Sequence, residues 1–105
     1  MKSRMSYHAR VQRIERFEYI LDTVGFGEEI ICTSSEIKGK MRLRILTDTG
    51  VIIIKEKNGE IVTAFIARIE QASAIWYEAR QKTMPNKLYQ KIKANRRFQE
   101  NQPKY

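Results

Sequence analysis

The feature that most constrains the fold is a β-prone run between residues 41 and 67, interrupted by short turn signals. Within it, Met41–Ile45 alternates strictly between apolar residues and arginines. Successive side chains of a strand point to opposite faces, so this pattern places apolar groups on one face and Arg42 and Arg44 on the other. The polar stretch Ser34–Lys40, which precedes this strand, is expected to be a loop.

The rest of the run predicts further strands of an antiparallel meander. Thr47–Gly50 is typical of a turn, and Val51–Lys55 is apolar on both faces, as expected for a central strand. The Asn58-Gly59 pair is a strong hairpin signal, which makes Ile61–Ala67 the returning strand. We therefore expect three antiparallel strands, and Glu29–Thr33 is a candidate fourth.

Helical spacing of apolar residues brackets this sheet. A stripe at steps of three and four predicts a first helix that Gly25 ends. The stripe consists of Tyr7, Val11, Ile14, Phe17, Leu21 and Val24. A second helix is expected from Ile69 to about Lys82 and a third over Asn86–Gln99, separated by Pro85. The prediction is one α+β domain, residues 1–105, with helices packed on one face of a three- to four-stranded antiparallel sheet.

Charge is the clearest functional signal. The 105 residues carry a formal net charge of +8, with an isoelectric point near 9.8. Residues 69–105 hold eight basic residues against three acidic ones. A basic, soluble domain of this kind is typical of a protein that binds nucleic acid, although basic residues also serve solubility alone. The candidate phosphate contacts of the last helix are Lys87, Lys91, Lys93, Arg96 and Arg97.

Several classes of function are disfavoured by what the sequence lacks. Cys32 is the single cysteine, so neither an internal disulfide nor a zinc site is expected. The same feature predicts a reducing, cytoplasmic location. We expect Cys32 to be a small buried residue of a strand. No apolar run approaches the roughly 18 residues of a membrane span, and the basic start leads to no secretory signal. No metal, cofactor or membrane partner is predicted.

A few side chains are candidates for chemistry. Histidine side chains ordinarily titrate near neutral pH, so His8, the single histidine, is a candidate proton carrier, although such histidines are commonly inert. Arg42 and Arg44 share one strand face and suit a phosphate, because a phosphate accepts two hydrogen bonds from a guanidinium. The alternative is that the Arg-bearing face of the sheet is simply exposed to solvent. Thr63 and Phe65 share a face of the returning strand, where a hydroxyl can contact a phosphate and a ring can stack on a base. The alternative is that Thr63 and Phe65 are ordinary strand residues, because β-branched and aromatic residues are common in strands. Lys38 and Lys40 extend the basic patch.

These features together resemble a known superfamily. The segment Ser6–Ala9, which contains His8 and is followed by Arg10, Arg13 and Arg16, is similar to the opening helix of the small metal-independent endoribonucleases that include barnase, colicin ribonuclease domains and RelE-type toxins. The run LTDTGVIIIKEKNGEIVTAF is similar to the turn, hairpin and Thr-bearing strand of their bacterial and phage toxin-like members. The resemblance covers residues 6–67. It departs at Phe65, where tyrosine is common, and the C-terminal helices have no counterpart.

The resemblance implies a reaction and a site. The 2′-OH of single-stranded RNA would attack its own 3′-phosphate and leave a 2′,3′-cyclic phosphate, without a metal. His8 would be the general acid or base. Arg42 and Arg44, with help from Lys40, would stabilise the charge that develops on the phosphate oxygens. Thr63 and Thr47 would orient the phosphate. The active site would lie on the open face of the sheet.

Other classes of function remain compatible with the sequence. A non-catalytic module that binds RNA or DNA, encoded by a phage or a bacterium, would use the same basic surface with no proton transfer. A structural or assembly protein would use the charge for solubility or for a protein partner. An acidic inhibitor protein is a further candidate partner of a toxin-like ribonuclease. Convergence of His8, Thr63 and the Arg42/Arg44 pair on one phosphate would favour the enzyme.

Overall fold

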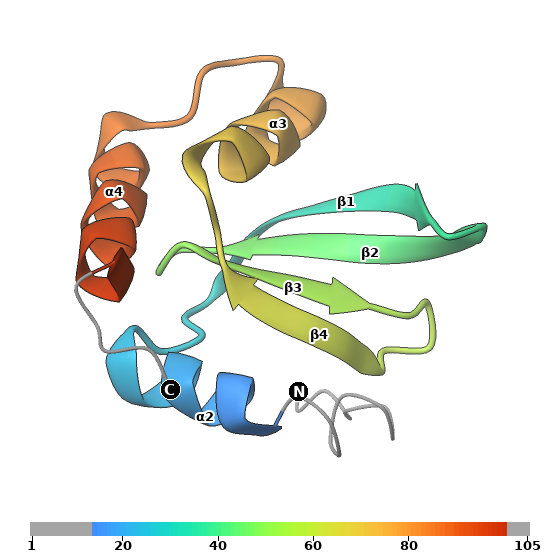
Figure 1. Ribbon diagram of the computed structural model, residues 1–105. Coiled ribbons are helices and arrows are strands. Elements are labelled where there is room, and N and C mark those ends of the chain that lie inside the picture. The colour runs from blue at the N-terminus through green and yellow to red at the C-terminus, as the bar shows by residue number, and fades with distance from the viewer. Residues whose placement is uncertain (1–13, 101–105) are drawn as a thin grey trace.

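The computed structural model describes residues 14–100, with the side chains of residues 16–96. The elements, in chain order, are α2 (Ile14–Thr23), β1 (Glu29–Ile37), β2 (Lys40–Thr47), β3 (Val51–Lys55), β4 (Ile61–Ile66), α3 (Ile69–Arg80) and α4 (Asn86–Glu100) (Figure 1). The strands form one antiparallel sheet in the order β1-β2-β3-β4. The predicted α+β fold, with a helix before the meander and two after it, is confirmed.

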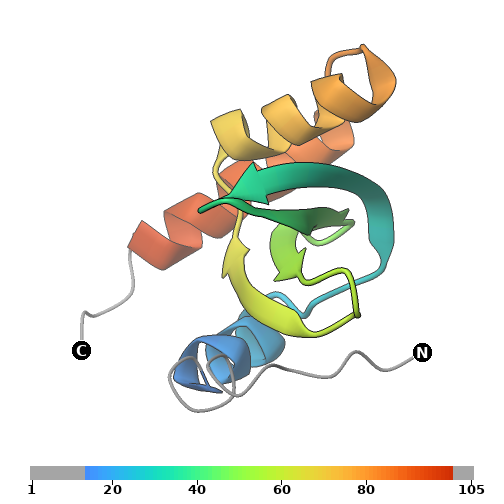
Figure 2. The same cartoon turned by 90° about the vertical axis from the view of Figure 1, so that its right-hand side faces the viewer.

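The sequence predicted that the helices pack on one face of the sheet. In the structure they do not share one face. Helix α2 lies against one face and α3 against the other, while α4 crosses one end of the strands (Figures 1 and 2). Two apolar clusters follow from this arrangement. One contains Ile52, Ile75 and Ile92 on the α3 side, and the other contains Phe17 and Val51 on the α2 side. Because β3 is internal and apolar on both faces, it contributes to both clusters.

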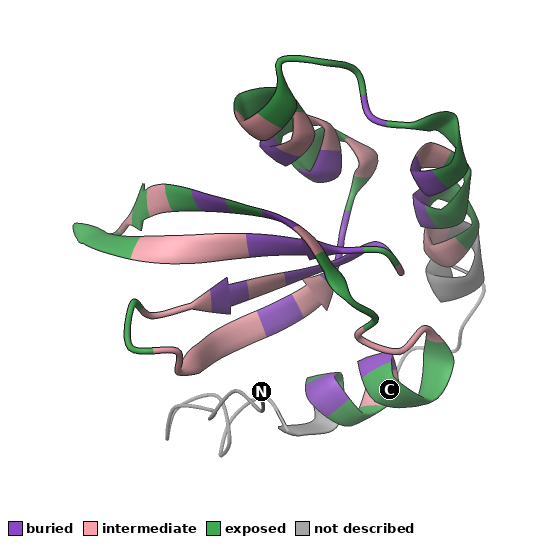
Figure 3. Ribbon diagram, turned by 180° about the vertical axis from the view of Figure 1, so that it is seen from behind, coloured by how far each residue is buried: buried purple, intermediate pink, exposed green. Residues whose placement is uncertain are grey.

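The β1–β2 hairpin is longer than predicted. Ser34–Ile37 belong to β1, and Ile37 pairs with Lys40, so the loop is reduced to Lys38 and Gly39. Both loop residues have positive φ, 52° and 80°, as a two-residue turn of type I′ requires. Lysine is unusual in such a turn, so the sequence carried no clear signal of it. The hairpin projects away from α4, and its tip is exposed (Figure 3).

The first helix turns a different side to the sheet than the predicted stripe. Phe17 is buried as expected, but Ile20 is 1% exposed, whereas Leu21 is 63% exposed. The helix ends where predicted, because Gly25 adopts a positive φ and its amide bonds to the Ile20 carbonyl at 2.7 Å. The inward side of α2 therefore runs through Phe17 and Ile20.

Cys32 is exposed, not buried as expected. It lies on β1, an edge strand, on the face of the sheet where α2 packs. Helix α2 contacts β4, at the opposite edge of the sheet, so it does not cover Cys32.

Helix α4 is held against the turn between β2 and β3. Leu88 and Ile92 are buried, and the Asn95 amide donates to the Thr49 carbonyl at 2.8 Å. A Cβ atom at Gly50 would lie 2.9 Å from Ile92 Cγ1 and 3.1 Å from Asn95 Nδ2, closer than packed side chains allow. Gly50 also has φ +86°. The absence of a side chain at Gly50 therefore sets how closely α4 approaches the sheet.

We expect Gly50→Ala to lower the free energy of unfolding by about 2–4 kcal/mol, through positive φ and through the displacement of α4. Gly39→Ala is the matched control, because Gly39 has φ +80° but open space around the new Cβ. Its loss should be confined to about 1–2 kcal/mol from the backbone. Urea denaturation of both variants measures the difference. Equal losses would show that contact with α4 does not constrain position 50.

Candidate nucleic-acid interface

A cavity of about 490 Å³ lies where β4 meets the three helices. It is referred to below as the arginine cavity. Arg16 comes from α2, Arg68 from the link between β4 and α3, and Arg96 from α4. The remaining wall residues are Tyr19, Ile20, Phe65, Ile66 and Gln71. Three basic side chains, distant in sequence, thus border one concave surface.

Local structure explains how each arginine reaches this place. Arg16 lies on the turn of α2 next to Phe17, which packs into the core. Arg68 precedes α3 in extended conformation, and its backbone amide donates to Gln71 Oε1 at 2.9 Å, which fixes the start of the helix. Arg96 follows Asn95, whose amide anchors α4 to the β2–β3 turn. Each guanidinium is therefore carried by a fixed backbone position.

The walls of the arginine cavity are positively charged. Its described lining residues include three arginines and no aspartate or glutamate. Arg16 Nη1 donates to Thr63 Oγ1 at 3.4 Å, which places Thr63 beside the cavity. Guanidinium groups bind phosphate through paired, charge-assisted hydrogen bonds. The chemistry of this surface suits a phosphate group.

Tyr19, which lines the same cavity, also carries an unsatisfied polar atom. Its hydroxyl is buried and has no hydrogen-bond partner among the described residues. A buried hydroxyl without a partner costs free energy. Tyr19 and Phe65 also give the cavity two aromatic rings in addition to its charge.

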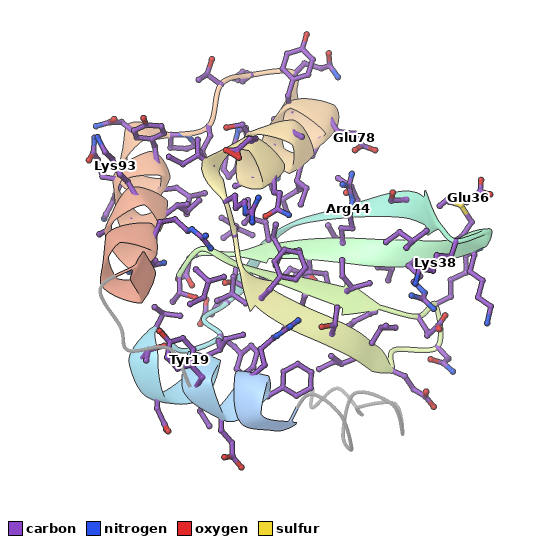
Figure 4. The ribbon with its side chains drawn as sticks, viewed as in Figure 1. Tyr19, Glu36, Lys38, Arg44, Glu78 and Lys93 are labelled. Carbon is purple, nitrogen blue, oxygen red and sulfur yellow. The ribbon has the colours of Figure 1, made fainter. Side chains whose placement is uncertain are left out.

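Arg42 and Arg44 are not available in the way the sequence analysis expected. They lie on the face that α3 partly covers, and each is paired with a carboxylate. Arg42 Nη2 lies 3.4 Å from Glu56 Oε1, and Arg44 Nη2 lies 2.8 Å from Glu78 Oε2 on α3 (Figure 4). The carboxylates offset the repulsion between the two arginines. The Nε atoms of both arginines are nevertheless buried without a hydrogen-bond partner among the described residues, so the two ion pairs satisfy these guanidinium groups only in part.

The predicted catalytic group is not assembled within the described residues. His8 lies outside them. Thr63 and Arg44 both pair with Ile54, from opposite sides, so two strand spacings, about 10 Å, separate their backbones. Thr63 is instead bonded to Arg16. The structure thus groups Thr63 with the arginine cavity and leaves Arg44 with α3.

Two further predicted phosphate contacts occupy different environments. Thr47 is 1% exposed; its hydroxyl accepts from the Val51 amide at 3.2 Å and lies 3.0 Å from Thr49 Oγ1. It supports the β2–β3 turn, and its burial does not fit a contact with a phosphate. Phe65 is half-buried, packs against the α3-side cluster and borders the arginine cavity.

The predicted lysines divide between two ends of the molecule. Lys38 and Lys40 are exposed at the β1–β2 hairpin, whereas Lys93 is exposed on α4 at the other end of the sheet (Figure 4). Lys87 and Lys91 are also exposed on α4. The side chain of Arg97 lies outside the described residues. Of the basic residues predicted on α4, Arg96 is the one among the described side chains that lines the arginine cavity.

The remaining observations concern other kinds of site. Partial burial, and then the Glu29 carboxylate, raise the pKa of the Cys32 thiol against the opposing effect of Lys55, so this thiol is a weak nucleophile at neutral pH. Among the described side chains, those of residues 16–96, no group of three acidic, His or Cys residues is placed to hold a metal ion. None of the helices described is long and apolar enough to cross a membrane.

Neither Arg68 nor Tyr19 was predicted from the sequence, and Arg16 was named only as part of the resemblance. The available signal was the row of Arg10, Arg13 and Arg16, spaced to lie along one side of a helix and off its apolar stripe. No family model matches the chain, and comparison with curated proteins and with solved structures finds no significant match.

Proposed function

We propose that this protein binds single-stranded RNA, with phosphates held in the arginine cavity. The observation that carries the proposal is the meeting of Arg16, Arg68 and Arg96, from three separate elements, around a cavity whose described walls hold no carboxylate. Basic residues that serve solubility alone have no reason to gather around one concave surface. The choice of RNA over other polyanions rests on the resemblance to small endoribonucleases.

The rest of the cavity fits the same ligand. The half-buried rings of Tyr19 and Phe65 offer apolar surface to a base or a ribose next to the bound phosphate. Lys93 extends the positive charge along α4 beyond Arg96. A strand of RNA that follows this path gains phosphate contacts, which supply sequence-independent affinity.

Arg68→Gln should weaken binding of a fluorescein-labelled single-stranded RNA about tenfold at low salt, because one charge-assisted phosphate contact is lost. Fluorescence anisotropy in EDTA buffer measures the affinity. The slope of log K against log salt should fall by about 0.7. Arg80→Gln is the matched control, since Arg80 is exposed on α3 and lies outside the cavity walls. If both variants lose affinity equally, the cavity is not the binding site.

Cleavage of the bound RNA is a second candidate function. The favouring observation is the bond from Arg16 to Thr63, which brings the residue expected to orient the scissile phosphate next to a guanidinium at the cavity. In the reaction, the 2′-oxygen attacks phosphorus and the bond to the 5′-oxygen breaks. One group takes the 2′-OH proton and another protonates the leaving oxygen. Arg16 would stabilise the charge on the non-bridging oxygens.

The test of cleavage is direct. Metal-free protein incubated with single-stranded RNA in EDTA should produce 2′,3′-cyclic phosphate ends, and an RNA with 2′-deoxy substitution at every position should stay intact. If the protein binds RNA but produces no 2′,3′-cyclic phosphate ends, it is a binding module and the proposal of cleavage is wrong.

A further inference from the structure

A second cavity, of about 330 Å³, lies on the other flank of α4. Its walls combine one indole, two lysines and several apolar groups: Trp76, Lys87, Lys91, Ile30, Pro85 and Leu88, with Asp48 at the side. It is called the tryptophan cavity below. The volume lies at the lower end of the range of about 300–1,000 Å³ found for small-ligand pockets. The Asp48 carboxylate is already engaged, because it accepts from the Glu28 amide at 2.9 Å.

The geometry of α4 relates this cavity to the arginine cavity. Leu88, Ile92 and Asn95 form the side of the helix that contacts the protein. At 100° per residue, Lys87 and Lys91 lie on one flank of that side and Arg96 on the opposite flank. Lys87 and Arg96 are nine positions apart, about 13 Å along the axis. The exposed outer side between the flanks carries Lys93. Helix α4 is thus a basic ridge with a cavity on each flank.

We propose that the tryptophan cavity takes an unpaired nucleobase of the RNA whose phosphates occupy the arginine cavity. This inference rests on the proposed function and adds a requirement, namely that the strand is single and that its bases are read by stacking. An indole beside two ammonium groups provides what a nucleotide needs: a flat apolar surface for the base and charge for the flanking phosphates. A base paired in a duplex cannot enter such a cavity without leaving its stack.

The described residues favour a base over a purely structural role for the indole. Trp76 is half-buried and packs against the α3-side cluster, but it remains part of a cavity wall. Lys87 and Lys91 are exposed and one helical turn apart, so both point along the same flank. An apolar peptide would gain from Ile30 and Leu88 but would leave both lysines without a role. An acidic peptide would use the lysines but not the indole.

Trp76 is the single tryptophan of the chain, so its fluorescence reports directly on this cavity. Titration with a single-stranded oligoribonucleotide should quench the emission saturably, with the midpoint that anisotropy gives for binding. An oligomer of the same length with abasic residues carries the same phosphates but no bases. It should bind by anisotropy and leave the emission unchanged. Binding of the normal oligomer without quenching, or equal quenching by the abasic one, would overturn the inference. Either result would leave the proposal that phosphates bind in the arginine cavity unaffected.

Variants supply a second readout. Trp76→Ala should weaken binding of the normal oligomer about fivefold or more and leave the abasic oligomer unaffected. Trp76→Phe keeps a ring and should bind nearly as wild type does. Tyr77→Ala is the matched control, because Tyr77 is an exposed aromatic residue on the same helix and outside the cavity walls. If circular dichroism shows that Trp76→Ala is unfolded, the wild-type comparison of normal and abasic oligomers decides. If the wild-type protein binds neither the normal nor the abasic oligomer, the proposed function itself is refuted.

Discussion

The triple variant Arg16→Gln, Arg68→Gln, Arg96→Gln is expected to bind single-stranded RNA about 10²- to 10³-fold more weakly than the wild type at low salt. Three phosphate contacts are lost together, and each is worth roughly a factor of five to ten at a partly exposed site. The slope of log K against log salt should fall by about 2, since each contact with a single strand contributes about 0.7. Anisotropy titrations at several salt concentrations give both quantities.

A variant with the same charge separates position from net charge. Lys38→Gln, Lys40→Gln, Arg80→Gln also removes three positive charges and lowers the formal net charge from +8 to +5. Its three positions are exposed and lie outside the walls of the arginine cavity. We expect it to lose less than tenfold in affinity. Equal losses in the two variants would mean that diffuse charge, and no defined cavity, attracts the RNA.

Replacement of His8 by alanine is expected to lower the rate of RNA cleavage about 10²-fold or more, with RNA affinity retained. The resemblance implies that His8 is the group that transfers a proton, and such transfer contributes 10²- to 10⁴-fold. Single-turnover cleavage in EDTA, followed by the appearance of 2′,3′-cyclic phosphate ends, measures the rate. Cleavage by His8→Ala at the wild-type rate would assign the proton transfer to another group.

Arg44 provides a companion test of the same reaction. The resemblance implies that Arg44→Ala slows cleavage by a similar factor, but Arg44 is paired with Glu78 at 2.8 Å. To act on a phosphate, the guanidinium must exchange Glu78 for the substrate. Glu78→Gln would weaken that pair, so cleavage should become faster if Arg44 acts on the phosphate. Unchanged cleavage by Glu78→Gln would indicate that Arg44 does not act on the phosphate.

The sheet could be predicted because its signals are local. Alternation in Met41–Ile45 and the Asn58-Gly59 turn each encode a strand or a reversal within a few residues, and both are observed. The Lys38-Gly39 turn was missed because a lysine with positive φ has no sequence signature. The distribution of helices over both faces was missed because an apolar stripe shows that a helix is covered on one side, but not by what.

The candidate interface could be predicted only in part. The basic character of α4 is visible in the sequence, and Arg96 was among its expected phosphate contacts. Its meeting with Arg16 and Arg68 depends on three separate packing events, at Phe17, at the end of β4 and at Gly50. The pairing of Arg44 with Glu78 has the same origin, since 34 positions separate the two residues. Tertiary contacts of this kind leave no periodicity for sequence reasoning to detect.

The position of β4 at the edge of the sheet gives the arginine cavity a second consequence. The strand Ile61–Ile66 is rich in β-branched and aromatic residues, and an edge strand of that composition invites a strand from another molecule to pair with it. Arg16, Arg68 and Arg96 lie around this edge, where their charge is expected to repel a second copy of the chain. A polyanion that neutralises the three arginines would therefore also remove this charge repulsion between copies of the chain, unless the polyanion itself covers the edge of β4. On the proposed function, binding of the RNA and self-association of the chain would therefore be coupled through the same three side chains.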